Sequence, residues 1–84
     1  MTRNPAVAGH FYPGKEQELK RLLSNMVNSG DEKVEAKAVI SPHAGYMYSG
    51  QVAGALFSSI QVPDRVILLG PDHRAATSSF AIMT

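Results

Sequence analysis

The chain has 84 residues, a formal net charge of +1 and charged residues at 18% of its length. This length allows one small domain with a limited core, because a chain of this size buries only roughly 60% of its unfolded surface. So weak a charge gives no field that recruits nucleic acid or an anionic membrane, and neither partner is expected. The chain lacks Cys, a signal-peptide pattern and a long apolar segment, so we expect a cytoplasmic protein without disulfides.

The first fourteen residues contain two prolines and two glycines and predict an irregular leader, with Phe11 and Tyr12 packing it onto the body. A helix is predicted to begin near Lys15, with acidic residues in its positive first turn, and to end at Gly30. Its amphipathic character follows from apolar residues at helical spacing, namely Leu19, Leu22, Leu23, Met26 and Val27.

Two short apolar runs, Ala38–Ile40 and Arg65–Leu69, predict strands that are buried on both faces. A second helical pattern lies between them, with Ser49 as its expected N-cap. Strand, helix and strand form a βαβ unit, whose right-handed crossover makes the two strands parallel. The predicted fold class is therefore α/β, with this unit and an additional N-terminal amphipathic helix. The residues of the second helical pattern are Val52, Ala53, Leu56, Phe57 and Ile60.

A histidine follows each predicted strand, His43 after the first and His73 after the second. Open α/β sheets bind their ligands at the carboxyl ends of parallel strands, so the fold can bring both imidazoles to one crevice. Neutral imidazole is a good ligand for divalent transition metals, and two histidines with a carboxylate form the iron site of non-haem oxygenases. Each histidine is therefore a candidate metal ligand, with a hydrogen-bonded turn histidine as the alternative.

Three further residues are candidates for lining the same pocket. Tyr46 follows His43 closely, and its phenol could bind a ligand oxygen or simply pack in the loop. Asp72 directly precedes His73, so in an extended segment the two side chains point in opposite directions, and Asp72 is expected to orient an imidazole or bond backbone amides. A carboxylate ligand of the metal is the alternative, since a loop can turn both side chains to one side. His10 lies in the leader, where an exposed or packed side chain is the alternative.

Three strings of the sequence resemble motifs of the MEMO family. They are Arg-Asn-Pro-Ala-Val-Ala-Gly-His-Phe-Tyr-Pro at residues 3–13, Ser-Pro-His-Ala-Gly-Tyr at 41–46 and Leu-Gly-Pro-Asp-His at 69–73. The family includes the protein B component of the AmmeMemoRadiSam system, and its fold is similar to that of class III extradiol dioxygenases. The resemblance implies that residues 1–84 form a single partial domain, the N-terminal part of a larger dioxygenase-like α/β fold.

The resemblance also implies that His43 and His73 hold Fe(II) or another divalent transition metal, with the remaining ligands supplied from outside this stretch. This chain alone is then expected to be inactive as an enzyme. The alternative is a non-catalytic scaffold that binds a metal, a peptide or a partner in the same crevice. We expect a small-molecule or peptide ligand, and self-association or a partner chain that covers the exposed edges of the sheet.

Overall fold

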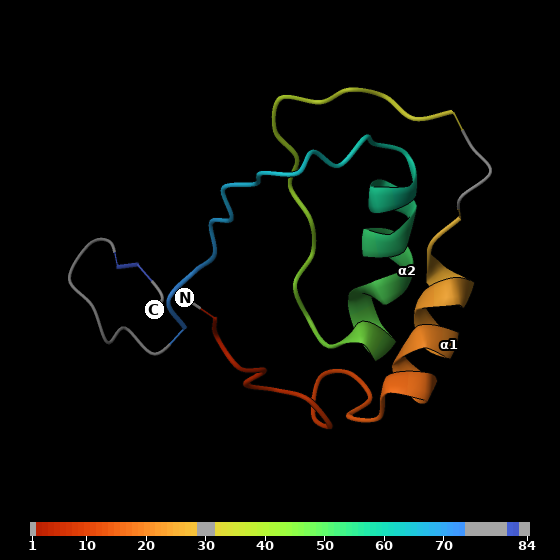
Figure 1. Cartoon of the computed structure of the whole chain (residues 1–84), viewed down its shortest axis with the longest axis vertical. Coiled ribbons are helices and arrows are strands. Elements are labelled where there is room, and N and C mark those ends of the chain that lie inside the picture. The colour runs from red at the N-terminus through yellow and green to blue at the C-terminus, as the bar shows by residue number, and fades with distance from the viewer. Residues whose placement is uncertain (1, 29–31, 74–80, 83–84) are drawn as a thin grey trace.

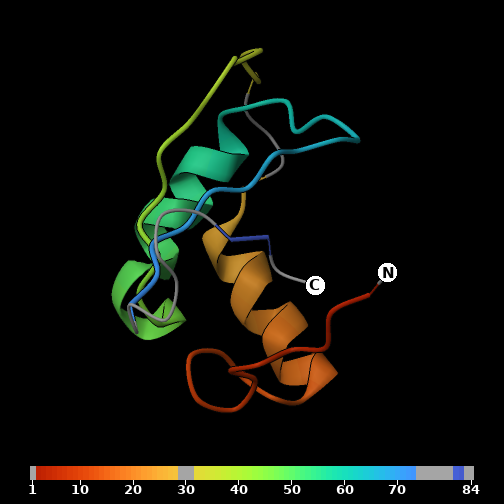
Figure 2. The ribbon, with the colours of Figure 1, turned by 90° about the vertical axis from the view of Figure 1, so that its left-hand side faces the viewer.

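A computed structural model describes residues 2–28, 32–73 and 81–82 of the chain. In this part of the chain two helices, α1 (Glu16–Met26) and α2 (Tyr46–Ser58), pack side by side, and extended segments surround them (Figures 1 and 2). With 11 and 13 residues, neither helix has the length or the apolar character needed to cross a bilayer.

Helix α1 begins where the sequence predicts it but ends before its predicted C-terminus. Glu16 and Glu18 occupy its first turn, where the helix dipole favours negative charge, and Lys20 pairs with Glu16 at 2.7 Å. The predicted end at Gly30 is wrong, because Val27 already has an extended backbone (φ −103°, ψ 123°). Asn28 then donates its backbone N–H to the Ser58 hydroxyl at 2.6 Å, which directs the chain toward α2.

Helix α2 starts three residues before its predicted N-cap. Gly45 occupies the N-cap position, and the backbone N–H of Ser49 already donates to the Gly45 carbonyl at 3.1 Å. The Ser49 hydroxyl donates to the Ala44 carbonyl at 2.9 Å, so it bonds backward onto the turn instead of capping the N–H groups ahead of it. The prediction of Ser49 as N-cap is therefore wrong, although Ser49 does hold the start of this helix.

The contact between α1 and α2 is made by small residues. The buried residues of α2 are Ser49, Gly50, Gly54 and Ser58, and the two glycines lie against Met26 at the end of α1. Of the apolar stripe predicted for α2, Val52 and Phe57 are exposed, while Ala53, Leu56 and Ile60 are half-buried. No apolar side chain in the described residues is fully buried, so close backbone approach joins the two helices.

Ser58 links both helices and is only 4% exposed. Its hydroxyl accepts the Asn28 N–H and donates to the Gly54 carbonyl, both at 2.6 Å. We expect Ser58→Ala to lower the free energy of unfolding by about 1–2 kcal/mol, because the Asn28 N–H loses its partner. Urea unfolding followed by circular dichroism measures this loss. Ser24→Ala, which removes an exposed hydroxyl bonded within α1, should change stability by less than about 0.5 kcal/mol; equal losses for the two variants would contradict this role.

The two predicted strands are not formed in the described residues. Ala38–Ile40 and Arg65–Leu69 are extended but lack a ladder of paired backbone groups, and Ile40 and Leu68 are 97% and 91% exposed. A strand needs a hydrogen-bonded neighbour, which these segments do not have here. The βαβ unit thus remains a prediction.

One isolated bridge has the direction that a βαβ unit requires. Val34 and Ile60 form a parallel bridge, in which Val34 N–H donates to the Ser59 carbonyl and Gln61 N–H donates to the Val34 carbonyl, both at 2.9 Å. From this bridge the segments 35–43 and 61–73 run in the same direction past α2 in both views (Figures 1 and 2). They start side by side, and each ends at a histidine.

Candidate functional site

The structure brings His43 and His73 together. Their ring centres lie 5.4 Å apart, with an angle of 39° between the ring planes. The two residues are thirty positions apart in the sequence, with α2 between them, and each lies at the end of an extended segment that runs past α2 from the Val34–Ile60 bridge. Both side chains are exposed, which leaves them open to a ligand from solvent.

The spacing of the two rings is close to that of two ligands of one metal ion. Two imidazoles that bind one ion through nitrogens about 2.1 Å from it, at an angle between roughly 90° and 110°, have ring centres roughly 4.5–5.3 Å apart. The observed separation of 5.4 Å lies just above this range. A third donor is not present, because no group of three His, Asp or Glu side chains in the described part of the chain lies close enough to hold an ion.

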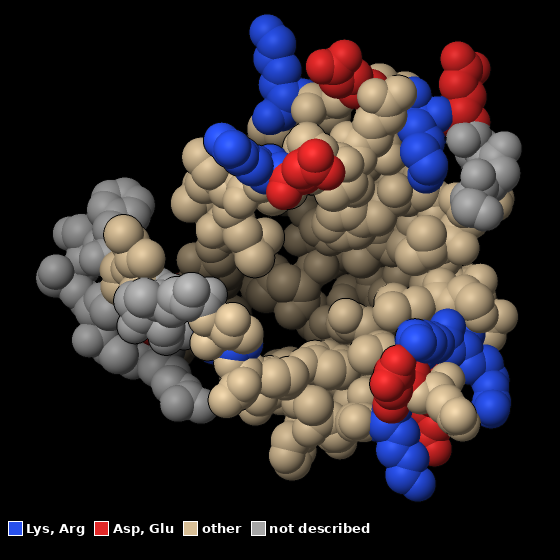
Figure 3. Space-filling model, viewed as in Figure 1, with Lys and Arg blue, Asp and Glu red and all other residues tan. Residues whose placement is uncertain are grey.

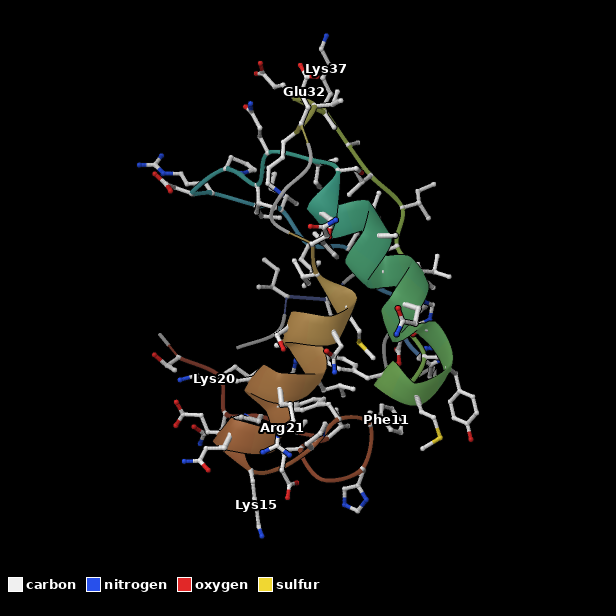
Figure 4. All side chains as sticks on the ribbon, turned by 90° about the vertical axis from the view of Figure 1, so that its right-hand side faces the viewer. Phe11, Lys15, Lys20, Arg21, Glu32 and Lys37 are labelled. Carbon is white, nitrogen blue, oxygen red and sulfur yellow. The ribbon has the colours of Figure 1, made fainter. Side chains whose placement is uncertain are left out.

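An open pocket of about 800 Å³ adjoins the two imidazoles. Apart from the histidines its walls are apolar. Phe11, which belongs to the leader, lies beside the first turn of α2 (Figure 4). On the face shown in Figure 3, the charged side chains gather mainly at the two ends of the molecule, away from the hollow in the middle. The pocket therefore suits the uncharged, apolar part of a ligand. Its lining residues are Val7, Phe11, Pro42, His43, Ala44, Gly45 and His73.

The other three candidates lie outside the described lining of this pocket. Tyr46 is half-buried and packs on Tyr12, with ring centres 5.3 Å apart and 34° between the planes. His10 is exposed in the leader, and Asp72 is exposed next to His73. Of the sequence candidates, the structure thus gathers only His43 and His73 at the pocket, while their role as metal ligands remains a prediction.

Sequence reasoning did not select the two leader residues that line the pocket, Val7 and Phe11. The leader turns back on itself, since Gly9 donates to the Tyr12 carbonyl at 2.7 Å and Phe11 donates to the Val7 carbonyl at 3.0 Å. Gly9 has φ +83°, a backbone conformation that glycine adopts without strain, so this glycine is the local signal for the turn. The turn places Val7 and Phe11 at the pocket, whereas Phe11 was expected only to pack the leader onto the body.

Comparison with known proteins identifies the class. The family described as Memo-like protein matches residues 3–84, and this chain therefore belongs to the Memo family. It is 46% identical over 72 residues to a MEMO1 family protein of Aquifex aeolicus, an alignment that covers 84% of this chain and 27% of that protein. It is 34% identical over 97 residues to a MEMO1 family protein of Methanopyrus kandleri, covering 100% of this chain and 34% of that protein.

A eukaryotic relative matches over the same stretch. The Caenorhabditis elegans protein named memo-1 homolog is 38% identical over 86 residues, which are 99% of this chain and 25% of that protein. The chain thus spans about a quarter to a third of the length of these curated relatives. No solved structure gives a significant match.

Proposed function

We propose that this chain supplies two imidazole ligands, from His43 and His73, to a divalent transition-metal site of a Memo-like protein. The observation that carries the proposal is the 5.4 Å separation of the two ring centres, which is close to the spacing of neighbouring ligands of one ion. Imidazole suits Fe(II) and other divalent transition metals, and the remaining ligands come from residues other than those described here.

The pocket beside the imidazoles determines what can approach the metal. Its apolar wall, to which Phe11 and Pro42 belong, would hold the hydrocarbon part of a small molecule while the imidazoles stay at one side. Fe(II), when bound, would supply the oxygen chemistry by which the class III extradiol dioxygenases that this family resembles open a catechol ring. We propose this activity for a complete protein that contains the chain; the described residues alone provide two ligands.

A non-catalytic scaffold is the second candidate, and the pocket itself favours it. The pocket is open, largely apolar and faced by exposed imidazoles, so it can take a peptide or small-molecule side group without any reaction. In this case His43 and His73 hold a metal or a ligand group, and no substrate is turned over. The two candidates share the histidine pair and differ only in whether the bound molecule then reacts.

Anaerobic calorimetric titration with Fe(II), followed by addition of catechol and O2, tests the proposal. We expect one-to-one Fe(II) binding to this chain, without O2 consumption above that of its His43→Ala variant, because two imidazoles do not complete the site. A relative of full length, titrated in the same way, should bind Fe(II) and consume O2 if the site is enzymatic, and should bind without consumption if it is a scaffold. Absence of Fe(II) binding from both proteins would contradict the metal site altogether.

A further inference from the structure

The leader is attached to the turn that carries His43. Tyr46 N–H donates to the Phe11 carbonyl at 2.8 Å, and the ring of Tyr12 packs on the ring of Tyr46 at 5.3 Å. Gly45 lies next to the same carbonyl, since a Cβ built on it would be in ordinary van der Waals contact with the Phe11 oxygen, at 3.5 Å. One backbone hydrogen bond and one ring pair therefore join residues 11–12 to residues 45–46.

The turn is held from its other side by α2. The Ser49 hydroxyl donates to the Ala44 carbonyl at 2.9 Å, and the backbone N–H of Ser49 donates to the Gly45 carbonyl at 3.1 Å. His43 directly precedes this doubly held segment, yet its own side chain is exposed and meets the ring of His73. The position of the His43 imidazole is thus set through its neighbours in the chain, and the leader is one of the two elements that fix them.

We infer that Tyr12 is a positioning residue for the His43 side of the metal site, acting through Tyr46. The inference rests on the proposed function, because it concerns the same histidine pair. Its physical basis is the packing of the two phenol rings. Such a contact changes the equilibrium constant between the ordered and the loosened turn by about 3- to 10-fold. Loss of the Tyr12 ring removes one of the contacts that hold the turn at residues 43–46, so the two imidazoles spend less time at the spacing that one ion requires.

Titration with Co(II) alone, followed by its visible absorption, tests this role in three variants. We expect Tyr12→Ala to weaken Co(II) binding by about 3- to 10-fold while the far-UV circular dichroism stays unchanged. Tyr12→Phe keeps the ring and should bind within about two-fold of the parent chain. Met47→Ala is the matched control, because Met47 lies next to Tyr46 on α2 and is 88% exposed; it should leave affinity unchanged.

The outcomes separate this inference from the function on which it rests. Loss of Co(II) affinity in His43→Ala together with normal affinity in Tyr12→Ala would overturn the role of Tyr12 and leave the metal site standing. Normal affinity in His43→Ala would overturn both. A loss in Tyr12→Phe equal to that in Tyr12→Ala, or a loss of helical signal in Tyr12→Ala, would also reject positioning through ring packing.

Discussion

Replacing either His43 or His73 with alanine is expected to weaken binding of Co(II) or Fe(II) by at least about 10- to 100-fold. Mutation of a residue that only orients a metal ligand typically lowers metal affinity by about 10- to 100-fold, so loss of a ligand itself should lower the affinity at least as much. The two rings lie 5.4 Å apart and would share one ion. Each single variant should therefore remove most of the binding, and the double variant should lose little more than either single one, because two residues that act as a unit are not additive.

His10→Ala is the matched control for this prediction. It removes the third histidine of the chain, which is exposed in the leader and lies outside the described lining of the pocket. We expect the metal affinity of this variant to equal that of the parent chain in the same calorimetric titration. Equal metal affinities for the parent chain, His43→Ala and His73→Ala would show that the two rings only pack on each other. Aromatic rings in contact ordinarily have centres about 4.5–7 Å apart, and the observed spacing lies within that range.

Gly54→Val is expected to destabilise the chain by about 3 kcal/mol or to prevent the two helices from packing. A Cβ built on Gly54 would overlap the carbonyl oxygen of Met26 and would lie 2.7 Å from its carbonyl carbon. Those atoms belong to the backbone at the end of α1, so the helices must separate to admit any side chain. Overpacking of this kind typically costs about 1–3 kcal/mol, and the backbone clash places this site at the upper end. Thermal unfolding followed by far-UV circular dichroism measures the effect.

Two other glycines provide graded controls for Gly54. A Cβ on Gly50 would meet the end of the flexible Met26 side chain, with the sulfur at 2.5 Å, so Gly50→Ala should be tolerated better than Gly54→Ala. A Cβ on Gly70 would meet nothing within 4 Å, and Gly70→Ala should change stability by less than about 0.5 kcal/mol. Close backbone approach of the helices would be refuted if Gly54→Val unfolded at the same temperature as Gly70→Ala.

The sequence predicted the helices better than their contact. The leucines and the acidic first turn of α1 have helical spacing and favourable helix electrostatics, and both are local properties. The buried face of α2 was not predicted, because Gly50, Gly54 and Ser58 carry no apolar signal. Their burial results from close approach of Met26, which depends on the path of the chain after α1.

For the strands and the site, too, the sequence predicted local features but not the contacts between distant parts of the chain. The apolar runs at 38–40 and 65–69 favour extended backbone, and both are extended, but a strand also requires a paired neighbour that no local pattern supplies. The expected cover of these exposed runs by a second copy or a partner chain remains a prediction. His43 and His73 were selected because each follows such a run, whereas Val7 reached the pocket through a turn at Gly9 that composition alone does not place.

X-ray absorption at the cobalt edge of the Co(II)-loaded chain tests the histidine pair most directly, because outer-shell scattering counts the imidazoles bound to the ion. We expect two imidazoles for the parent chain and for His10→Ala, and one for His43→Ala and for His73→Ala at saturating metal. An imidazole count that is the same in the parent and in both pair variants would mean that His43 and His73 do not bind one metal together.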